Sequence, residues 1–343
     1  MRLIQFQRSE NNRAVGLIED DLVYDITSFN KNWDRLYNIF WEARKKGITI
    51  EELISGSDFR SRSDTYNYSK LLMQFPNDPK GWIIPPIDHP DPAHCIITGT
   101  GLTHLGSMAQ RSNMHKTNDK SAKTDSQKMF EMGLEGGKPK LGTRGVQPEW
   151  FYRGNGFILR GHNDFLDIPE FTEDGGEEPE IVGCYIIGDD GIPYRLGFAI
   201  ANEWSDHAME RVNYLWLAPS KLRTCSIGPE LITDIKFKDI RGNCCIYRDD
   251  NLIYDSGELL TGEDNMTHTL ANLEDHHFKY PQFRIPGDVH IHFFGTMKLS
   301  YGNRDKFRDG DKIVIKFDNM GGSLINYVRK LPSNTNPIQI LKG

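Results

Sequence analysis

Two glutamates stand two positions apart at the start of a strongly apolar segment. Residues 175–183 read GGEEPEIVG, and the apolar run continues as CYIIG. In a β-strand the side chains at i and i+2 point to the same face, so Glu178 and Glu180 would lie side by side. The apolar run predicts a buried strand, where paired carboxylates must either protonate or meet a cation. The segment therefore predicts a cation at the mouth of a buried strand.

A third acid, Glu203, ends a second strand-like run, FAIANE. Three carboxylates at strand ends form a hard-oxygen site that suits Mg²⁺, Mn²⁺ or Ca²⁺, with coordination positions left for water and substrate. The alternative is that the glutamate pair faces water at the edge of a sheet. Two glycines before the pair and a long apolar strand after it favour the metal site, with Mg²⁺ as the first choice.

The overall composition excludes several classes of partner. The chain has 343 residues, 38% of them hydrophobic, and a formal net charge of −7. An acidic surface argues against nucleic acid or an anionic membrane as the main partner. No stretch approaches the roughly 18 apolar residues of a membrane helix, and MRLIQFQRSE lacks the apolar region of a signal peptide. We therefore expect a cytoplasmic protein whose five scattered cysteines are reduced.

A proline-rich stretch, WIIPPIDHPDPAH, predicts a boundary between a small N-terminal domain (1–85) and a larger domain (86–343). The first is predicted to be α+β, and the second is dominated by strand-like runs. Helical patterns are expected near 33–46, 50–55, 66–75, 205–217 and 266–279. Residues 112–147 are polar and glycine-rich, with little apolar periodicity, and we predict that this insert is a lid over the functional site.

Several motifs resemble the fumarylacetoacetate hydrolase superfamily, in the family's order. EEPEIVGCYIIG is similar to the family's Y-E-x-E-L strand, and ANEWSDHAMER is similar to its N-D-W-S-A-R-D segment. QPEWFYRGNG, NYLWLAPSKLRTCSIGP and PGDVHIHFFGT resemble further family segments. The resemblance covers about residues 92–335. It is strongest to a sugar-acid branch that includes 2-keto-3-deoxy-pentonate dehydratases.

The resemblance implies a mainly β fold with α+β parts, a mixed β-sandwich roll behind a small N-terminal domain, and a homodimer. It implies that Glu178, Glu180 and Glu203 bind the metal. Lys221 matches the family's active-site lysine, and Thr296 ends the family's P-G-D-x-I-x-T-G-T segment.

One departure from the family disfavours hydrolysis of a carbon–carbon bond. Family hydrolases carry G-L-N-Y-x-x-H, whose histidine activates water, but GLTHLGS places Ser107 at that position. A serine is a poor base at neutral pH. Using His104 instead would require a three-residue shift of the frame.

The predicted site suits a 2-keto acid, whose carboxylate and keto oxygens can chelate a cation. The cation would lower the pKa of the C3–H group, and the resulting enolate could expel a hydroxyl from C4. Lys221, with a lowered pKa, is predicted to be the base or to stabilise the enolate. Ser107 and Thr296 are predicted to hydrogen-bond the carboxylate or the leaving hydroxyl. The residues predicted to contact the rest of the substrate are Arg111, Asp125, Lys128 and Arg153.

These features predict a Mg²⁺-dependent lyase that dehydrates a 2-keto-3-deoxy sugar acid, a pentonate first, to a 2-ketoglutarate semialdehyde-type product. Two alternatives stay open: a hydrolase that cleaves an acylpyruvate or 2,4-diketo acid, and a non-catalytic sugar-acid binding protein. His290 and His292 could form a metal site, but packed strand histidines are favoured because no acid follows them. His276 and His277 are predicted to lie at the surface or at an interface.

Overall fold

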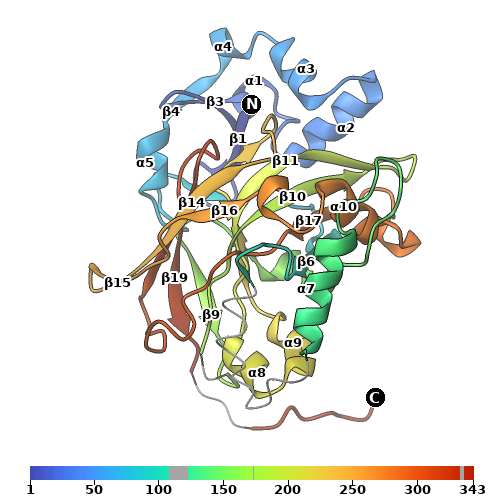
Figure 1. The fold of residues 1–343 in the computed structure, drawn as a ribbon. Coiled ribbons are helices and arrows are strands. Elements are labelled where there is room, and N and C mark those ends of the chain that lie inside the picture. Colours follow the sequence, from blue (N-terminus) through green and yellow to red (C-terminus); the bar gives the residue numbers. More distant parts are fainter. Residues whose placement is uncertain (108–122, 173, 333–335) are drawn as a thin grey trace.

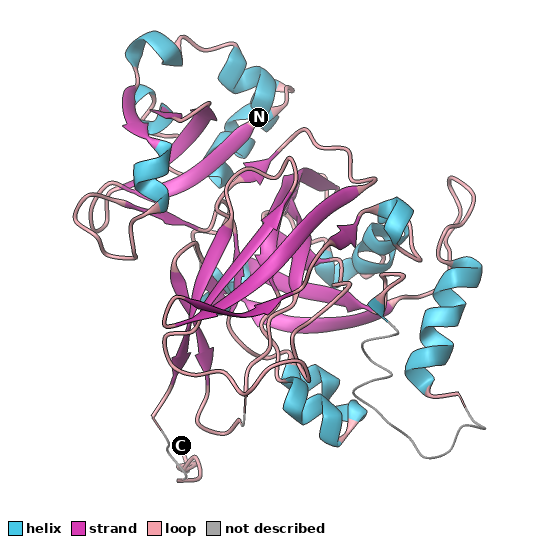
Figure 2. Cartoon of the chain, turned by 60° about the vertical axis from the view of Figure 1, so that its left-hand side comes forward, coloured by secondary structure: helices cyan, strands magenta, loops and turns pink. Residues whose placement is uncertain are grey.

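The computed structural model of the chain describes residues 1–107, 123–172, 174–332 and 336–343. Two β-sheets form the centre of this described part, and helices lie around them (Figures 1 and 2). The larger sheet has thirteen described strands and the smaller has six. The prediction of a mainly β protein with additional helices is confirmed.

The strands of the larger sheet are β1 (Arg2–Gln7), β2 (Arg13–Glu19), β3 (Leu22–Asp25), β4 (Asp64–Asn67), β5 (Trp82–Ile84), β6 (Cys95–Gly101), β7 (Glu149–Asn155), β8 (Leu159–Arg160), β10 (Pro179–Ile187), β11 (Pro193–Asn202), β12 (Cys225–Ile227), β13 (Leu231–Ile232) and β17 (Val289–Phe293). The smaller sheet contains β9 (Asp164–Ile168), β14 (Ile240–Arg248), β15 (Asn251–Asp255), β16 (Leu259–Thr261), β18 (Lys312–Phe317) and β19 (Leu324–Lys330).

The α-helices are α1 (Ile26–Phe29), α2 (Leu36–Lys46), α3 (Ile50–Ser55), α4 (Phe59–Arg62), α5 (Tyr68–Leu72), α7 (Asp125–Gly136), α8 (His207–Val212), α9 (Leu217–Ser220) and α10 (Leu270–Phe278). Short 3₁₀ turns are η1 (Pro92–His94), η2 (Gly156–Ile158), η3 (Tyr214–Trp216), η4 (Glu263–Asn265) and η5 (Pro281–Phe283). None of these described helices has the length and apolar character needed to cross a membrane.

The main path of the larger sheet runs β4-β3-β2-β1-β13-β11-β10-β17-β6-β7. The N-terminal strands join this sheet through β1, where Leu3 pairs with Leu231 of β13. The predicted domain boundary near residue 85 therefore falls directly after β5. Strands on both sides of this boundary belong to the same larger sheet.

Strand β10 lies between two hydrophobic cores, as its apolar run predicts. All nine of its residues are buried. Ile181 packs in the core between the two sheets, whereas Val182 and Cys184 belong to the core that includes Leu36 of α2. Successive side chains of a strand point to opposite faces, so a strand covered on both sides must be apolar throughout.

Helix α7 lies inside the insert that is predicted to be a lid, although the sequence of this insert shows little apolar periodicity. Thr124 accepts a hydrogen bond from the backbone of Gln127, whose side chain accepts one from the backbone of Thr124. This capping box starts a helix despite the weak apolar periodicity. The remainder of the predicted lid falls partly on residues 108–122, outside the described part of the chain.

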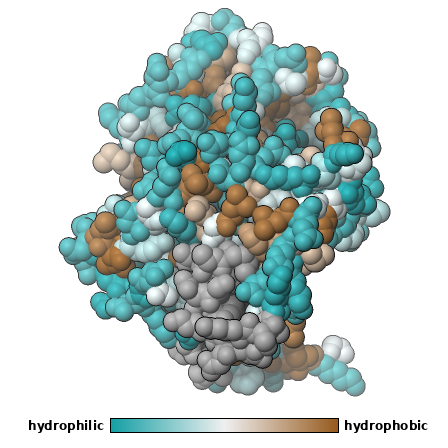
Figure 3. Space-filling view, viewed as in Figure 1, coloured by the Kyte–Doolittle hydropathy of each residue, from teal (hydrophilic) through white to brown (hydrophobic). Residues whose placement is uncertain are grey.

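The surface seen in Figure 3 is mainly hydrophilic, and apolar side chains appear there in small separate groups. This distribution agrees with the composition of an ordinary globular protein.

Three histidines pack together inside the protein, next to the central sheet. His277 Nε2 lies 3.0 Å from His290 Nδ1, and the His277 ring stacks on His292 at 4.5 Å between centroids. Of the two placements predicted for His276 and His277, the surface is wrong, because α10 packs His277 against β17 and both residues are buried. Neither group with metal-ligand spacing among the described residues includes these histidines.

The buried histidines predict loss of stability in mild acid. Burial lowers the pKa of His292 to about 3, so below pH 6.5 the unfolded chain binds more protons than the folded chain. The contribution of His292 is present at neutral pH and is lost as pH falls from about 6.5 toward 3. Between pH 7 and 5 the wild type should lose about 2 kcal/mol more unfolding free energy than His292→Gln. Urea unfolding at both pH values measures this difference, and parallel pH profiles would contradict it.

Candidate active site

The ends of two paired strands bring the three predicted metal-binding glutamates together. Glu178 precedes β10, Glu180 lies within it, and Glu203 directly follows β11. The antiparallel pairing continues past the strand ends, where Glu203 N–H donates to Glu178 O at 2.9 Å. All three side chains are buried, and each offers an oxygen within 4.8 Å of those of the others.

Protein donors hold one oxygen of each carboxylate. Glu178 Oε1 accepts hydrogen bonds from Lys221 Nζ at 2.5 Å and from His207 Nε2 at 2.9 Å. Glu203 Oε2 accepts from Lys221 Nζ at 3.0 Å, and Glu180 Oε2 accepts from the Gly295 N–H at 2.7 Å. These contacts fix the orientation of all three carboxylates.

The other oxygens form a site that a cation would complete. Glu180 Oε1 and Glu203 Oε1 are both buried without a hydrogen-bond partner. The neighbouring cation is Arg153, whose Nη1 lies 3.5 Å from Glu203 Oε1. Buried acceptors are rarely left unsatisfied in folded proteins. A set of carboxylate oxygens with two buried atoms left open fits Mg²⁺ or Mn²⁺, which prefer oxygen ligands.

The raised pKa values of Glu180 and Glu203 reflect a local shortage of positive charge. Burial, together with the charges of Glu203 and Glu178, raises the pKa of Glu180 well above its usual range. Burial also raises the pKa of Glu203 to about 7, although Lys221 and Arg153 oppose the shift. Burial would raise the pKa of Glu178 too, but Lys221 and His207 hold it well below its usual range. A dication would favour the ionised form of all three acids.

Lys221 follows α9 at the centre of this cluster and is almost completely buried. Besides its contacts with Glu178 and Glu203, its Nζ lies 3.8 Å from Glu210 Oε1. Burial alone would lower the pKa of Lys221, but these three carboxylates together raise it. In this arrangement the pKa of Lys221 is therefore raised, and the lowered pKa predicted for a lysine beside a bound dication stays a prediction.

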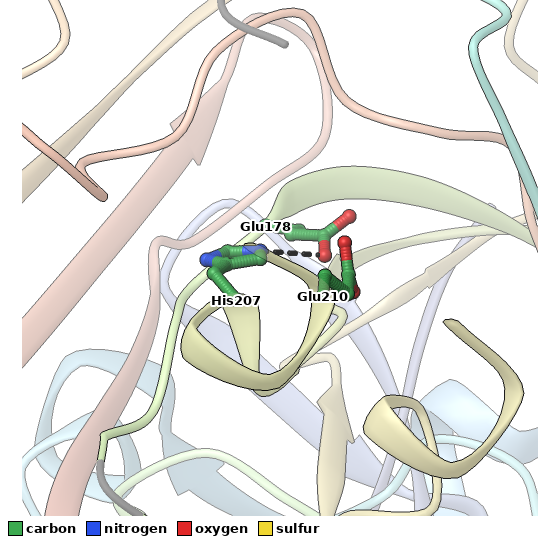
Figure 4. Close-up of side chains that lie close together, drawn as sticks. All are labelled: Glu178, His207 and Glu210. Carbon is green, nitrogen blue, oxygen red and sulfur yellow. Dashed lines mark hydrogen bonds and ion pairs between the residues drawn. The ribbon is translucent and has the colours of Figure 1, made fainter. Parts of the chain in front are cut away.

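A second buried group, Glu178, His207 and Glu210, also has ligand-like spacing, and Figure 4 shows it. The motif ANEWSDHAMER includes His207 and Glu210, but no role was predicted for either residue. His207 and Glu210 are three positions apart on α8, so they share one helix face. The i, i+3 spacing of a histidine and a glutamate within the helix predicted near 205–217 could have indicated this group. Burial would lower the pKa of His207, but Glu178 and Glu210 raise it.

Two glycines of β6 make room for the acids. A Cβ at Gly99 would stand 2.4 Å from Glu203 Oε1, and one at Gly101 would stand 1.8 Å from Glu149 Oε2. A side chain at either position would displace a carboxylate. These glycines therefore leave the space that the two carboxylates occupy.

A cavity opens beside the carboxylates. Its described lining includes the predicted Lys221, Ser107 and Thr296, together with Glu149, which sequence reasoning missed. The full described lining is Gly101, Leu102, Ser107, Glu149, Glu178, His207, Glu210, Lys221, Gly295, Thr296, Met297 and Leu299.

Both predicted hydroxyl groups at the cavity are oriented by backbone carbonyls. Ser107 Oγ donates to His104 O at 2.7 Å. Thr296 Oγ1 lies 2.9 Å from Pro179 O and 3.0 Å from Lys298 O, which share its single proton. The oxygen of each hydroxyl can therefore accept a hydrogen bond from a substrate more readily than it can donate one.

Three residues predicted to contact substrate do not line this cavity. Arg153 is fully buried behind Glu203, and its Nη2 donates to Trp204 O at 2.6 Å. Asp125 and Lys128 form an ion pair at 3.0 Å on the exposed face of α7. Asp125 and Lys128 were predicted as residues of the lid and Arg153 from a motif, and neither a segment nor a motif determines the direction of a side chain. The fourth residue, Arg111, lies outside the described residues.

His104 does not replace the histidine of the family hydrolases. It is buried, its Nε2 lies 2.9 Å from Thr261 Oγ1, and it does not line the cavity. Burial lowers its pKa to about 3, so it is neutral at physiological pH.

The geometry predicts that Glu180 is needed for metal binding. Replacing Glu180 with Gln removes one carboxylate charge, and we expect the affinity for Mg²⁺ to fall about 100-fold or more. Isothermal titration calorimetry measures the affinity directly. Glu135→Gln, at an exposed position of α7, is the matched control and should bind Mg²⁺ like the wild type. Equal Mg²⁺ affinity in Glu180→Gln and the wild type would contradict the assignment.

Comparisons with known proteins identify the fold. No protein-family model and no curated protein matches the sequence. Among solved structures, a 2-keto-3-deoxyarabinonate dehydratase has a TM-score of 0.68 at 19% identity, over 96% of this chain and 99% of that one. A 2-keto-3-deoxy-D-arabinonate dehydratase complexed with magnesium and 2,5-dioxopentanoate has a TM-score of 0.67 at 18% identity, over 96% and 99%.

A third similar structure is 2-hydroxyhepta-2,4-diene-1,7-dioate isomerase from Mycobacterium marinum. Its TM-score is 0.55 at 13% identity, over 96% of this chain and 98% of that one. The chain therefore has the fold of these proteins, and the predicted fumarylacetoacetate hydrolase-like architecture is confirmed.

Proposed function

We propose that the protein is a Mg²⁺-dependent lyase that removes water from a 2-keto-3-deoxy sugar acid, with a pentonate as substrate and 2,5-dioxopentanoate as product. The observation that carries this proposal is the convergence of three buried carboxylates beside a cavity, with two of their oxygens left unsatisfied. The similar dehydratase structure with magnesium and 2,5-dioxopentanoate supports the same choice of metal and product.

Glu178, which lines the cavity, would hold the cation together with Glu180 and Glu203. A 2-keto acid could chelate a cation held there through its carboxylate and keto oxygens, and the cation would supply Lewis acidity that polarises the C2 carbonyl and acidifies C3–H. The rest of the substrate would then extend along the cavity lined by Glu149, Glu210 and the loop after β17.

Lys221 stabilises the negative charge that develops on the C2 oxygen. Its Nζ is buried at the cavity wall, 2.5 Å from Glu178 Oε1, 3.0 Å from Glu203 Oε2 and 3.8 Å from Glu210 Oε1. A fixed positive charge in a buried site favours a transition state that gains negative charge. Lys221 therefore serves as an electrostatic group, and another residue must accept the C3 proton.

Glu149 is the acceptor that the strand geometry favours. Glu149, Phe151 and Arg153 alternate along β7 and are all buried, so they face the site together. Lys221 Nζ lies 5.0 Å from the centre of the Phe151 ring, and Arg153 lies beside Glu203. Glu149 is the member of this row that lines the cavity, and a positioned carboxylate is an effective base for an acidified C–H group.

The proposed reaction conserves every atom of the substrate. Glu149 takes the C3 proton, the electron pair forms the C2–C3 double bond of an enolate, and the enolate expels the C4 hydroxyl. That hydroxyl leaves as water with the proton that Glu149 received. Transfer of a proton from C5 to C3 then moves the remaining double bond to C4–C5, and the resulting enol becomes the C5 aldehyde.

A product assay tests the proposal. The purified protein with Mg²⁺ should convert a 2-keto-3-deoxypentonate to the aldehyde acid, and both EDTA and Glu178→Gln should abolish turnover. Glu135→Gln should retain it. A panel of pentonate and hexonate 2-keto-3-deoxy acids would define chain length and stereochemistry.

Three outcomes would contradict the proposal. Turnover in excess EDTA would exclude the metal, and pyruvate release from an acylpyruvate without dehydration would favour a hydrolase. Substrate binding without any product would favour a binding protein. The homodimeric state and the cytoplasmic location stay predictions.

The role of Lys221 predicts a specific kinetic defect. Lys221→Met should lower kcat by about 10²–10³, because one stabilising charge is lost from the transition state. Lys221→Arg should retain part of the activity. Calorimetry should show that Lys221→Met still binds Mg²⁺, which separates catalysis from assembly of the metal site. Wild-type kcat in Lys221→Met would contradict the assigned role.

A further inference from the structure

We infer that Glu210 selects against substrates with a second carboxylate, so that the cavity accepts a 2-keto acid whose far end carries hydroxyl groups. The inference rests on the proposed function only in placing the 2-keto acid end of the ligand at Glu178, Glu180 and Glu203. It adds a determinant of specificity to that site.

Glu210 is an acid inside the cavity wall. It lies on α8 with 1% of its surface exposed, and it lines the cavity. Its Oε1 accepts a hydrogen bond from Ser220 Oγ at 2.7 Å. Figure 4 shows that its carboxylate lies close to that of Glu178, although the two residues come from different elements. The position of this charge is therefore fixed by the fold.

The cationic groups of the described lining are already engaged by carboxylates. Lys221 is shared among Glu178, Glu203 and, at 3.8 Å, Glu210 itself. His207 Nε2 is hydrogen-bonded to Glu178. A substrate with a second carboxylate would place this group near Glu210 in this part of the cavity. None of the cations of the described lining would be left to pair with that carboxylate. Like charges brought together in a buried site strongly disfavour binding.

A hydroxyl at the same place would be attracted to Glu210 instead of repelled by it. A carboxylate accepts hydrogen bonds, and a hydroxyl donates one to it without adding charge. Glu149 also lines the cavity, so a polyhydroxylated chain would find acceptors supplied by both β7 and α8. The same acid that repels a carboxylate thus favours a sugar-acid tail.

A matched pair of five-carbon 2-oxo acids tests this selectivity. The probes are 5-hydroxy-2-oxopentanoate and 2-oxoglutarate, which differ only in a hydroxymethyl or a carboxylate at C5. Calorimetry with Mg²⁺ present should show that the wild type binds the hydroxy acid at least about tenfold more tightly. Glu210→Gln should reduce this ratio about tenfold, mainly because 2-oxoglutarate binds more tightly.

The controls separate this inference from the proposed function. Glu135→Gln should leave the ratio unchanged, and if Glu210→Gln does not fold, Glu149→Gln tests the same effect of an acidic lining. Neither probe has a hydroxyl at C4, so the ratio does not depend on turnover. A preserved ratio without any dehydration of sugar acids would overturn the proposed function alone. Equal affinities in the wild type, an unchanged ratio in Glu210→Gln, or no binding of either probe would overturn the inference.

Discussion

The burial of more carboxylates than cations is the constraint on which the rest of the site depends. Four buried glutamates (Glu178, Glu180, Glu203 and Glu210) surround two permanent cations, Lys221 and Arg153. Such a cluster is costly unless a ligand or protons supply positive charge. The two unsatisfied oxygens and the raised pKa values of Glu180 and Glu203 both indicate where that charge is missing. A dication at this point would neutralise the acids and provide the electrophile for keto-acid chemistry.

The fold positions this cluster through ordinary strand geometry. Pairing of β10 with β11 places Glu203 beside Glu178, and alternation along β10 directs Glu180 to the same side as Glu178. The glycine at position 99 leaves the volume that the Glu203 carboxylate occupies. Because these contacts come from the buried centre of the larger sheet, the site should need little rearrangement to bind a metal.

The parts that could be predicted from the sequence were those encoded locally. The apolar run of β10 and the i, i+2 spacing of its glutamates predicted a buried strand with an acidic end. The order of the family motifs then indicated Glu203 as a metal ligand and Lys221 as an active-site residue. The orientation of side chains across elements could not be predicted. Arg153 lies beside Glu203 and does not line the cavity. The pKa of Lys221 is raised because three acids from separate segments converge on it. Helix α7 was missed because its capping box, rather than apolar periodicity, defines where it begins.

Related folds do not determine the substrate, since similar structures include a sugar-acid dehydratase and an isomerase named for a dicarboxylate. The metal centre is therefore the central claim, and crystals soaked in Mn²⁺ test it most directly. The account predicts one anomalous difference peak per chain, within about 2.0–2.3 Å of oxygens from Glu178, Glu180 and Glu203. A peak at another place, or no peak with these carboxylates directed apart, would contradict it.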